Sequence, residues 1–98
     1  MANKQFYVYI MAKARNSTFY VGVTSDLVRR VWEHKQGVAD GFTKKYGIKM
    51  LVYYEVFNDP EQAIHREKRL KKWTRVSKMK AIEQMNPNWD DLYGAICA

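Results

Sequence analysis

Cysteine and proline are scarce in this chain of 98 residues, and long uncharged apolar runs are missing. The one cysteine, Cys97, excludes a disulfide framework and a cysteine-based metal cluster. No stretch is both long and uncharged enough to cross a bilayer, so a membrane partner is not expected. The first five residues lead directly into a strand-like pattern without the features of a signal peptide, and we expect a cytoplasmic protein.

The length and the apolar content predict one compact domain. A chain of this size buries about 60 to 65 per cent of its unfolded surface, and 47 per cent of these residues are apolar. We expect a single domain over residues 1–98, with a core at about 5–85 and a short helix at 88–94. This length leaves no room for a second domain.

Positive charge is in excess and unevenly placed. Seventeen Lys and Arg residues against ten Asp and Glu give a formal charge of +7, and eight of the seventeen lie between Arg66 and Lys80. Such a cluster favours a polyanionic partner, nucleic acid above all. A membrane surface or a solvated helix face are the alternatives that composition leaves open.

Two alternating segments predict a β-hairpin at the start of the chain. Residues 6–11 and 19–23 place successive side chains on opposite faces, and the residues between them form the turn. We expect Tyr9 to pair with Tyr20, which sets both tyrosines on one face together with Gly22. Because Gly22 has no side chain, a backbone segment or a ligand can approach there.

A helix is predicted between the capping residues 24–26 and Gly37, which is expected in a left-handed cap. Its apolar seam is short and runs through Val31 and His34. Arg30 falls on the same inward side instead of the polar side. An inward arginine needs an anionic or polar partner.

The rest of the chain predicts a third strand and more helices. Residues 38–47 are expected to form a loop or an irregular turn, and residues 50–57 a strand. A helix over 60–74 with Asp59 as its N-cap follows, and then another at 77–85. These elements predict a small α/β (α+β) domain with a three-stranded, mainly antiparallel sheet flanked by helices.

Glu67 lies on the apolar seam of the predicted helix, four residues after Ala63 and three before Leu70. A carboxylate against a core must find a cation or hydrogen bonds, because burying it ionised and unpaired costs several kcal/mol. An ion pair with Arg30 or a neighbouring lysine satisfies this need, and so does a metal ion.

The order and spacing of these motifs resemble the GIY-YIG nuclease superfamily. The matching segments are Tyr7-Val8-Tyr9, Tyr20-Val21-Gly22, Thr24 to Arg30, and Ala63 to Glu67. The chain is similar to small stand-alone bacterial members, and to the N-terminal nuclease domain of the incision subunit of nucleotide-excision repair. The resemblance implies the GIY-YIG fold and a metal-dependent endonuclease, a hydrolase of DNA phosphodiester bonds, with structure-selective repair or recombination as a target class.

The same resemblance implies the catalytic residues Tyr9, Tyr20, Arg30, His34 and Glu67. Glu67 would hold one Mg²⁺ or Mn²⁺ ion, and Arg30 would face the phosphate oxygens. His34 would hydrogen-bond a phosphate oxygen or orient a tyrosine. A free tyrosine has a pKa near 10, so a tyrosine base needs a cationic neighbour. Either tyrosine could be that base, or could position a water ionised by the metal.

The expected DNA-binding surface is the basic face of the helix over 60–74 together with the loop before the third strand: Lys44, Lys45, Arg66, Lys68, Arg69, Lys71, Lys72 and Arg75, with Lys78 and Lys80 beyond them. Such side chains bind phosphates without reading bases. A protein partner is therefore expected to supply target choice.

Two further points stay open at the level of sequence. In many relatives an asparagine completes the site, and here Asn86 or Asn88 is available, in a stretch that could equally be a helix stop and cap. The alternative function is a non-catalytic or weakly catalytic nucleic-acid-binding accessory module. A protein-interaction domain with an acidic partner is the third interpretation.

Overall fold

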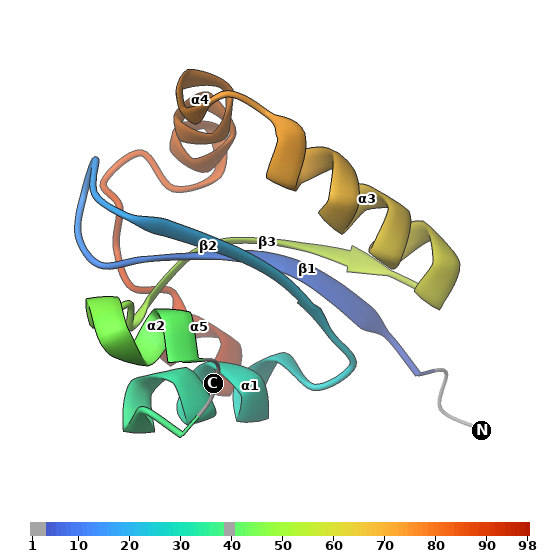
Figure 1. Ribbon diagram of the computed structural model, residues 1–98. Helices are drawn as coiled ribbons and strands as arrows, with labels where there is room; N and C mark the ends of the chain where they lie inside the picture. Colours follow the sequence, from blue (N-terminus) through green and yellow to red (C-terminus); the bar gives the residue numbers. More distant parts are fainter. Residues whose placement is uncertain (1–3, 39–40) are drawn as a thin grey trace.

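The computed structural model of the protein describes residues 4–38 and 41–98, which build one sheet covered by helices on both faces (Figure 1). Its strands are β1 (Phe6–Ala12), β2 (Phe19–Thr24) and β3 (Met50–Phe57). Their order is β2-β1-β3 and both pairings are antiparallel. The predicted α+β class and three-stranded antiparallel sheet are confirmed.

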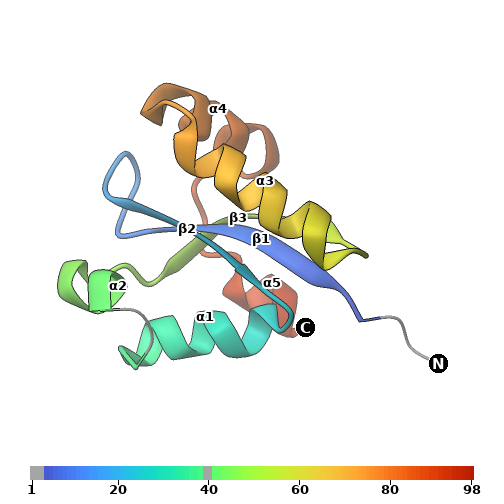
Figure 2. The ribbon, with the colours of Figure 1, turned by 45° about the vertical axis from the view of Figure 1, so that its right-hand side comes forward.

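The helices divide between the two faces of the sheet. They are α1 (Leu27–Gln36), α2 (Gly41–Tyr46), α3 (Pro60–Lys72), α4 (Arg75–Met85) and α5 (Tyr93–Cys97). Helices α3 and α4 cover one face, and α1, α2 and α5 cover the other (Figure 1, Figure 2). Within the described ranges, no helix has the length and apolarity that crossing a bilayer requires.

The central strand β1 is buried on both faces. Val8 and Ile10 pack under α3 and α4, whereas Tyr9 and Met11 pack on the side of α1. Each of these four residues is at most 1% exposed. A tyrosine on such a strand must find a partner for its hydroxyl inside the protein.

The hairpin register differs from the prediction by two residues. Tyr9 pairs with Gly22 and Met11 with Tyr20, whereas Tyr9 was expected opposite Tyr20. The turn moves to residues 13–18, and Asn16 within it adopts a left-handed φ of 56°. A shift by two keeps every side chain on its predicted face, so both tyrosines still share one face with Gly22. The observed register sets the aromatic ring of Tyr9 against the one residue of β2 that has no side chain.

The predicted loop at 38–47 was wrong in part, because helix α2 occupies Gly41–Tyr46. Gly37 (φ 73°) ends α1 and Gly47 (φ 64°) follows α2. These left-handed conformations favour glycine and mark helix ends rather than a continuous loop. Residues 39 and 40 lie outside the described residues.

Of the C-terminal helices, α3 begins as predicted and the two that follow do not. Asp59 and Pro60 start α3. Thr74 caps α4 by accepting a hydrogen bond from the backbone of Ser77, so α4 begins at Arg75 instead of residue 77. The short terminal helix begins at Tyr93 instead of residue 88, because a turn precedes it.

Asn86 fixes that turn to the sheet. It is 4% exposed, and its Nδ2 donates to the backbone oxygens of Val52 (3.2 Å) and Asp90 (2.7 Å). Its Oδ1 accepts from the backbone nitrogen of Asp90 at 3.0 Å. Since both amide donors are used inside the fold, Asn86 is the helix stop and cap that the sequence left as one of two interpretations.

Replacing Asn86 with alanine should lower the free energy of unfolding by about 1 to 3 kcal/mol, because the carbonyls of Val52 and Asp90 lose their donors. Urea denaturation of the two proteins measures the difference. The matched control is Asn88→Ala at an exposed position, where a change within about 0.5 kcal/mol is expected. Equal effects at the two positions would contradict the structural role of Asn86.

Candidate active site

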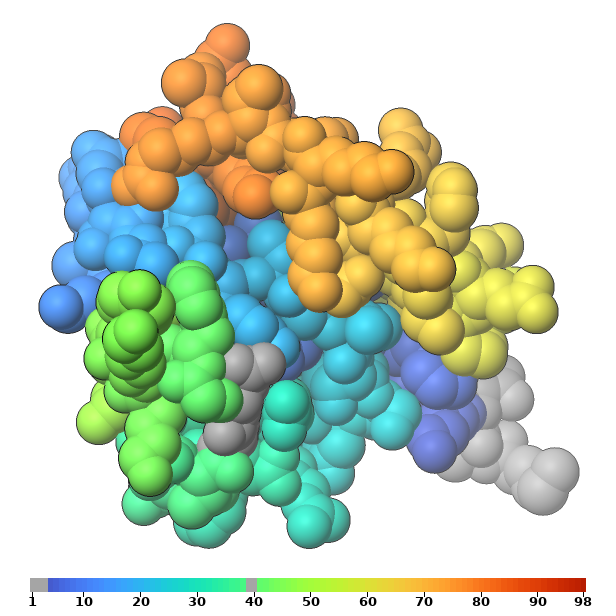
Figure 3. All heavy atoms as spheres, in the orientation of Figure 1, coloured from blue at the N-terminus to red at the C-terminus, as the bar shows by residue number. Residues whose placement is uncertain are grey.

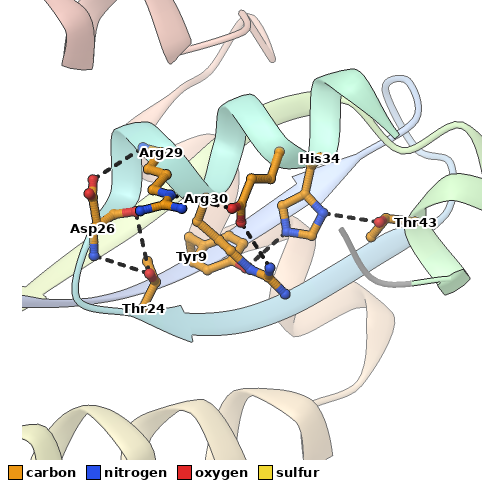
Figure 4. Close-up of polar contacts among 8 residues, drawn as sticks. Tyr9, Thr24, Asp26, Arg29, Arg30, His34 and Thr43 are labelled. Atoms are coloured by element: carbon orange, nitrogen blue, oxygen red, sulfur yellow. Dashed lines mark hydrogen bonds and ion pairs between the residues drawn. The ribbon is translucent and has the colours of Figure 1, made fainter. Parts of the chain in front are cut away.

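Strand β1 places Tyr9 at the centre of a chain of buried polar side chains. Its Oη lies 3.0 Å from Nε2 of His34, and Nδ1 of His34 lies 3.0 Å from Oγ1 of Thr43 (Figure 4). The three residues come from β1, α1 and α2 and are at most 2% exposed. The inward position predicted for His34 is confirmed.

Arg30 runs from α1 alongside Tyr9 (Figure 4). Its Nη1 is 3.1 Å from Oε1 of Glu33, and the guanidinium lies beside Tyr9 (Figure 4). Burial opposes the guanidinium charge, but the nearby oxygens of Tyr9, Glu33 and Tyr20 raise the pKa of Arg30 above its ordinary value. The side chain is 33% exposed, so the cation is held in place and still reaches solvent.

His34 links Tyr9 and Thr43 through both of its ring nitrogens. A neutral imidazole has one donor and one acceptor nitrogen, so when Nε2 accepts from the hydroxyl of Tyr9, Nδ1 donates to Thr43.

Tyr20 lies on the edge strand β2 and is half-buried. Its ring centroid is 6.3 Å from that of Tyr9 and 5.2 Å from that of His34. A Cβ atom at Gly22 would stand 2.5 Å from Oη of Tyr9 and 3.0 Å from Cε2 of Tyr20. The ring of Tyr9 fills the space at Gly22 where a ligand or a backbone segment was predicted to approach.

Glu67 stands on α3, between Ala63 and Leu70, which are fully buried. Its side chain is 13% exposed, and its Oε2 is 2.7 Å from Nζ of Lys71 one turn later. Of the two ion-pair partners that the sequence allowed, the structure therefore shows the lysine, while Arg30 pairs with Glu33.

The sheet separates Glu67 from the other four candidate residues. Helix α3 packs on one face of the sheet and α1 on the other, and β2 is the edge strand on this side (Figure 1, Figure 2). Figure 3 shows this strand, in blue, at the bottom of a hollow between α3 and α2. A ligand lying across β2 would meet Tyr20 and Arg30 on one side and α3 on the other.

The predicted basic surface contains two kinds of cation. Exposed cations for which the structure shows no ion pair among the residues it describes are Lys44, Lys45, Lys68, Arg69 and Lys72. Arg66, by contrast, donates from Nε and Nη2 to both oxygens of Glu55 at 2.9 Å each. Arg75 donates to the backbone oxygen of Ser17 at 2.6 Å and lies over the ring of Phe19. These two arginines hold α3 and α4 against the sheet.

Glu55 is the centre of a second polar cluster, shared by Arg66 and the hydroxyl of Tyr53. Burial alone would raise the pKa of Glu55, but the hydrogen bonds from Arg66 and Tyr53 hold that pKa below its usual value. Burial and the bond to Glu55 raise the pKa of Tyr53 to about 12. An ionised carboxylate and a protonated phenol are thus locked together, which suits a structural role.

Two residues of the site were missed from the sequence. Glu33 pairs with both Arg30 (3.1 Å) and Arg29 (3.4 Å), and its spacing of three and four residues from them was the available signal. Thr43 gave no local signal, because its contact with His34 depends on the packing of α2 against α1.

Comparisons with known proteins agree with this geometry. A family model described as the GIY-YIG catalytic domain matches residues 5–80. The UPF0213 protein SH2523 of Staphylococcus haemolyticus is 35% identical over 78 residues, which cover 80% of this chain and 94% of that protein. The UPF0213 protein CPE1444 of Clostridium perfringens is 37% identical over 76 residues, which cover 78% and 81%.

A solved structure is also similar. The solution NMR structure of the UPF0213 protein BH0048 from Bacillus halodurans has a TM-score of 0.55 and 26% sequence identity. The match covers 89% of this chain and 92% of that chain. The arrangement of sheet and helices is therefore shared with a protein of the same group.

Replacing Gly22 with alanine should lower the free energy of unfolding by about 1 to 3 kcal/mol, because the new methyl group collides with the ring of Tyr9. Denaturation followed by near-ultraviolet circular dichroism measures both the stability and the tyrosine environment. The matched control is Gly94→Ala, where a Cβ meets nothing within 4 Å and a helical alanine should be neutral or stabilise by up to about 1 kcal/mol. A Gly22→Ala protein as stable as the wild type would show that Tyr9 does not lie over Gly22.

Proposed function

The chain belongs to the GIY-YIG catalytic-domain family, and on that premise we propose that it is a metal-dependent endonuclease that hydrolyses DNA phosphodiester bonds. The carrying observation is that Tyr20 on β2 shares one face of the sheet with Arg30 (Figure 4), while α3, which bears the nearly buried carboxylate of Glu67, packs against β2 on the other face. These are the cation, the hydroxyl and the carboxylate that phosphodiester hydrolysis uses.

Arg30 is the group that binds the phosphate. It stays protonated during the reaction, and its planar fork matches two phosphate oxygens. Glu33 holds the guanidinium, Tyr9 lies beside it (Figure 4), and its exposed part is available to a ligand. A cation fixed before the substrate arrives stabilises the charge that develops on the phosphate without reorganising.

The two tyrosines take different roles. Tyr9 is 1% exposed and is hydrogen-bonded within the protein to His34, so it acts as a positioning residue. Tyr20 is half-buried on the edge strand, where its hydroxyl can meet the attacking water. His34 and Thr43 keep Tyr9 in one orientation beside Arg30 (Figure 4).

Glu67 would hold the divalent ion. Among the described residues no group of three or more His, Cys, Asp or Glu side chains is placed to hold a metal, which does not suit a closed zinc site. One desolvated carboxylate does suit Mg²⁺ or Mn²⁺, because such ions keep several waters and take further oxygens from a substrate phosphate. When bound, the ion supplies positive charge against the leaving 3′-oxygen. In the protein without metal, Lys71 provides the positive charge beside the Glu67 carboxylate.

The exposed cations on both sides of β2 would bind the DNA backbone. Lys68, Arg69 and Lys72 project from α3, and Lys44 and Lys45 from α2. Contacts of this kind bind phosphates of any sequence. We therefore extend the proposal to cleavage selected by DNA structure, in repair or recombination, with a protein partner supplying target choice.

Glu67→Gln should lower metal-dependent cleavage about 100-fold or more while leaving the fold intact, because the amide keeps the shape of the side chain and loses its charge. The assay uses labelled duplex, single-strand, flap, fork and four-way-junction DNA with Mg²⁺ or with EDTA. Lys71→Ala is the matched control, since it breaks the same ion pair but keeps the carboxylate.

Cleavage that survives in Glu67→Gln would contradict the metal assignment. A wild-type protein that cuts none of these substrates, yet binds them in a salt-sensitive way, would make the accessory binding module the correct function.

Tyr20→Phe should lower kcat about 100-fold, and Tyr9→Phe only about tenfold, because the first removes the hydroxyl at the reacting water and the second a positioning group. Single-turnover cleavage measures both. Since Thr43 acts on Tyr9 through His34, the losses in Tyr9→Phe and Thr43→Val should not add in the double variant. A larger loss in Tyr9→Phe than in Tyr20→Phe would show that Tyr9 is the residue at the reacting water and Tyr20 the positioning residue.

A further inference from the structure

A row of aromatic rings leads away from the candidate active site along α2. The ring of Phe42 lies 6.4 Å from that of Tyr20, and the ring of Tyr46 lies 4.9 Å from that of Phe42. Phe42 is 43% exposed and Tyr46 42% exposed. The row therefore begins at a proposed catalytic tyrosine and continues over the surface.

Packing alone does not explain this row. Helix α2 buries Thr43, and the following Ile48 is fully buried, so other side chains anchor the segment. An isolated exposed apolar side chain is ordinary, whereas exposed rings in contact with one another are typical of an interaction surface. In the part of the chain that the structure describes, the exposed aromatic residues are Trp32, Phe42 and Tyr46.

The charge around the row indicates the ligand. Lys44 and Lys45 are exposed beside the rings, Nζ of Lys45 lies 5.5 Å from the ring centroid of Tyr46, and α2 has no acidic residue. An acidic peptide would use the lysines but not the flat rings. A nucleic-acid strand uses both, because its phosphates pair with lysines and its bases stack on aromatic faces.

Resting on the nuclease function proposed above, we propose that Phe42 and Tyr46 form a stacking site for unpaired bases of the substrate strand next to the cleaved bond. With the phosphate at Arg30, the adjoining strand reaches the row at Tyr20. Bases inside a duplex stack on their own neighbours and leave no face for a side chain. The substrate class is nucleic acid that is single-stranded or splayed beside the scissile phosphate.

Binding of labelled DNA, measured by fluorescence anisotropy in EDTA at one fixed low salt concentration, tests the stacking site without cleavage. The probes are a single strand of about 12 nucleotides and a blunt duplex. Tyr46→Leu should raise the Kd for the single strand about tenfold and change the Kd for the duplex less than about twofold. Tyr46→Phe, which keeps the ring, should bind both probes as the wild type does.

Two control variants complete the design. Trp32 is an exposed aromatic residue two positions before His34, which puts it on the opposite side of α1, so Trp32→Leu should leave both Kd values unchanged. Lys44→Ala should weaken both probes alike, because it removes a phosphate contact. Melting temperatures of all variants show whether α2 is intact.

Unchanged single-strand binding in Tyr46→Leu, or equal weakening for the two probes, would overturn the stacking site and leave the rings to a protein partner. Each result is separate from the nuclease assay. Selective loss of single-strand binding in a protein that cuts nothing would refute the nuclease and keep the base-stacking surface. Normal cleavage by a protein whose single-strand binding does not depend on the Tyr46 ring would refute the stacking site and keep the nuclease.

Discussion

The hydroxyl of Tyr9 is the constraint on which the site depends. Strand β1 is buried on both faces, so this polar group lies in the interior and must be hydrogen-bonded there. It is hydrogen-bonded to His34, and His34 in turn to Thr43. One buried tyrosine thereby ties β1, α1 and α2 together beside Arg30 (Figure 4).

The candidate site residues lie on the two faces of the sheet. The cation and the tyrosines belong to the face covered by α1, whereas Glu67 belongs to α3 on the opposite face. Helix α3 packs against β2, the edge strand on which Tyr20 lies. Because Gly22 has no side chain, the ring of Tyr9 lies directly against the backbone of this edge strand. In the function we propose, a phosphate across β2 is what joins the two halves of the site.

Several elements could be predicted because their signals are local. Asp26 and Gly37 bound α1, Asp59 and Pro60 begin α3, and alternation assigns the faces of the hairpin. The register could not be predicted, because pairings that differ by two residues give the same faces and only the fit of Tyr9 over Gly22 distinguishes them. Helix α2 was missed because the glycines that end helices also suit a loop.

The sequence by itself determined the strands, the main helices, the inward position of Arg30 and His34, and the family resemblance, because caps, periodicity and motif spacing act within a few residues. Only the tertiary structure decided the pairings between elements far apart in the chain. It assigned Arg66 to Glu55 and Tyr9 to His34. It also brought Thr43 to His34. The physical reason is that an ion pair or a buried hydrogen bond forms between whichever groups the packing of helices on the sheet brings within about 3 Å.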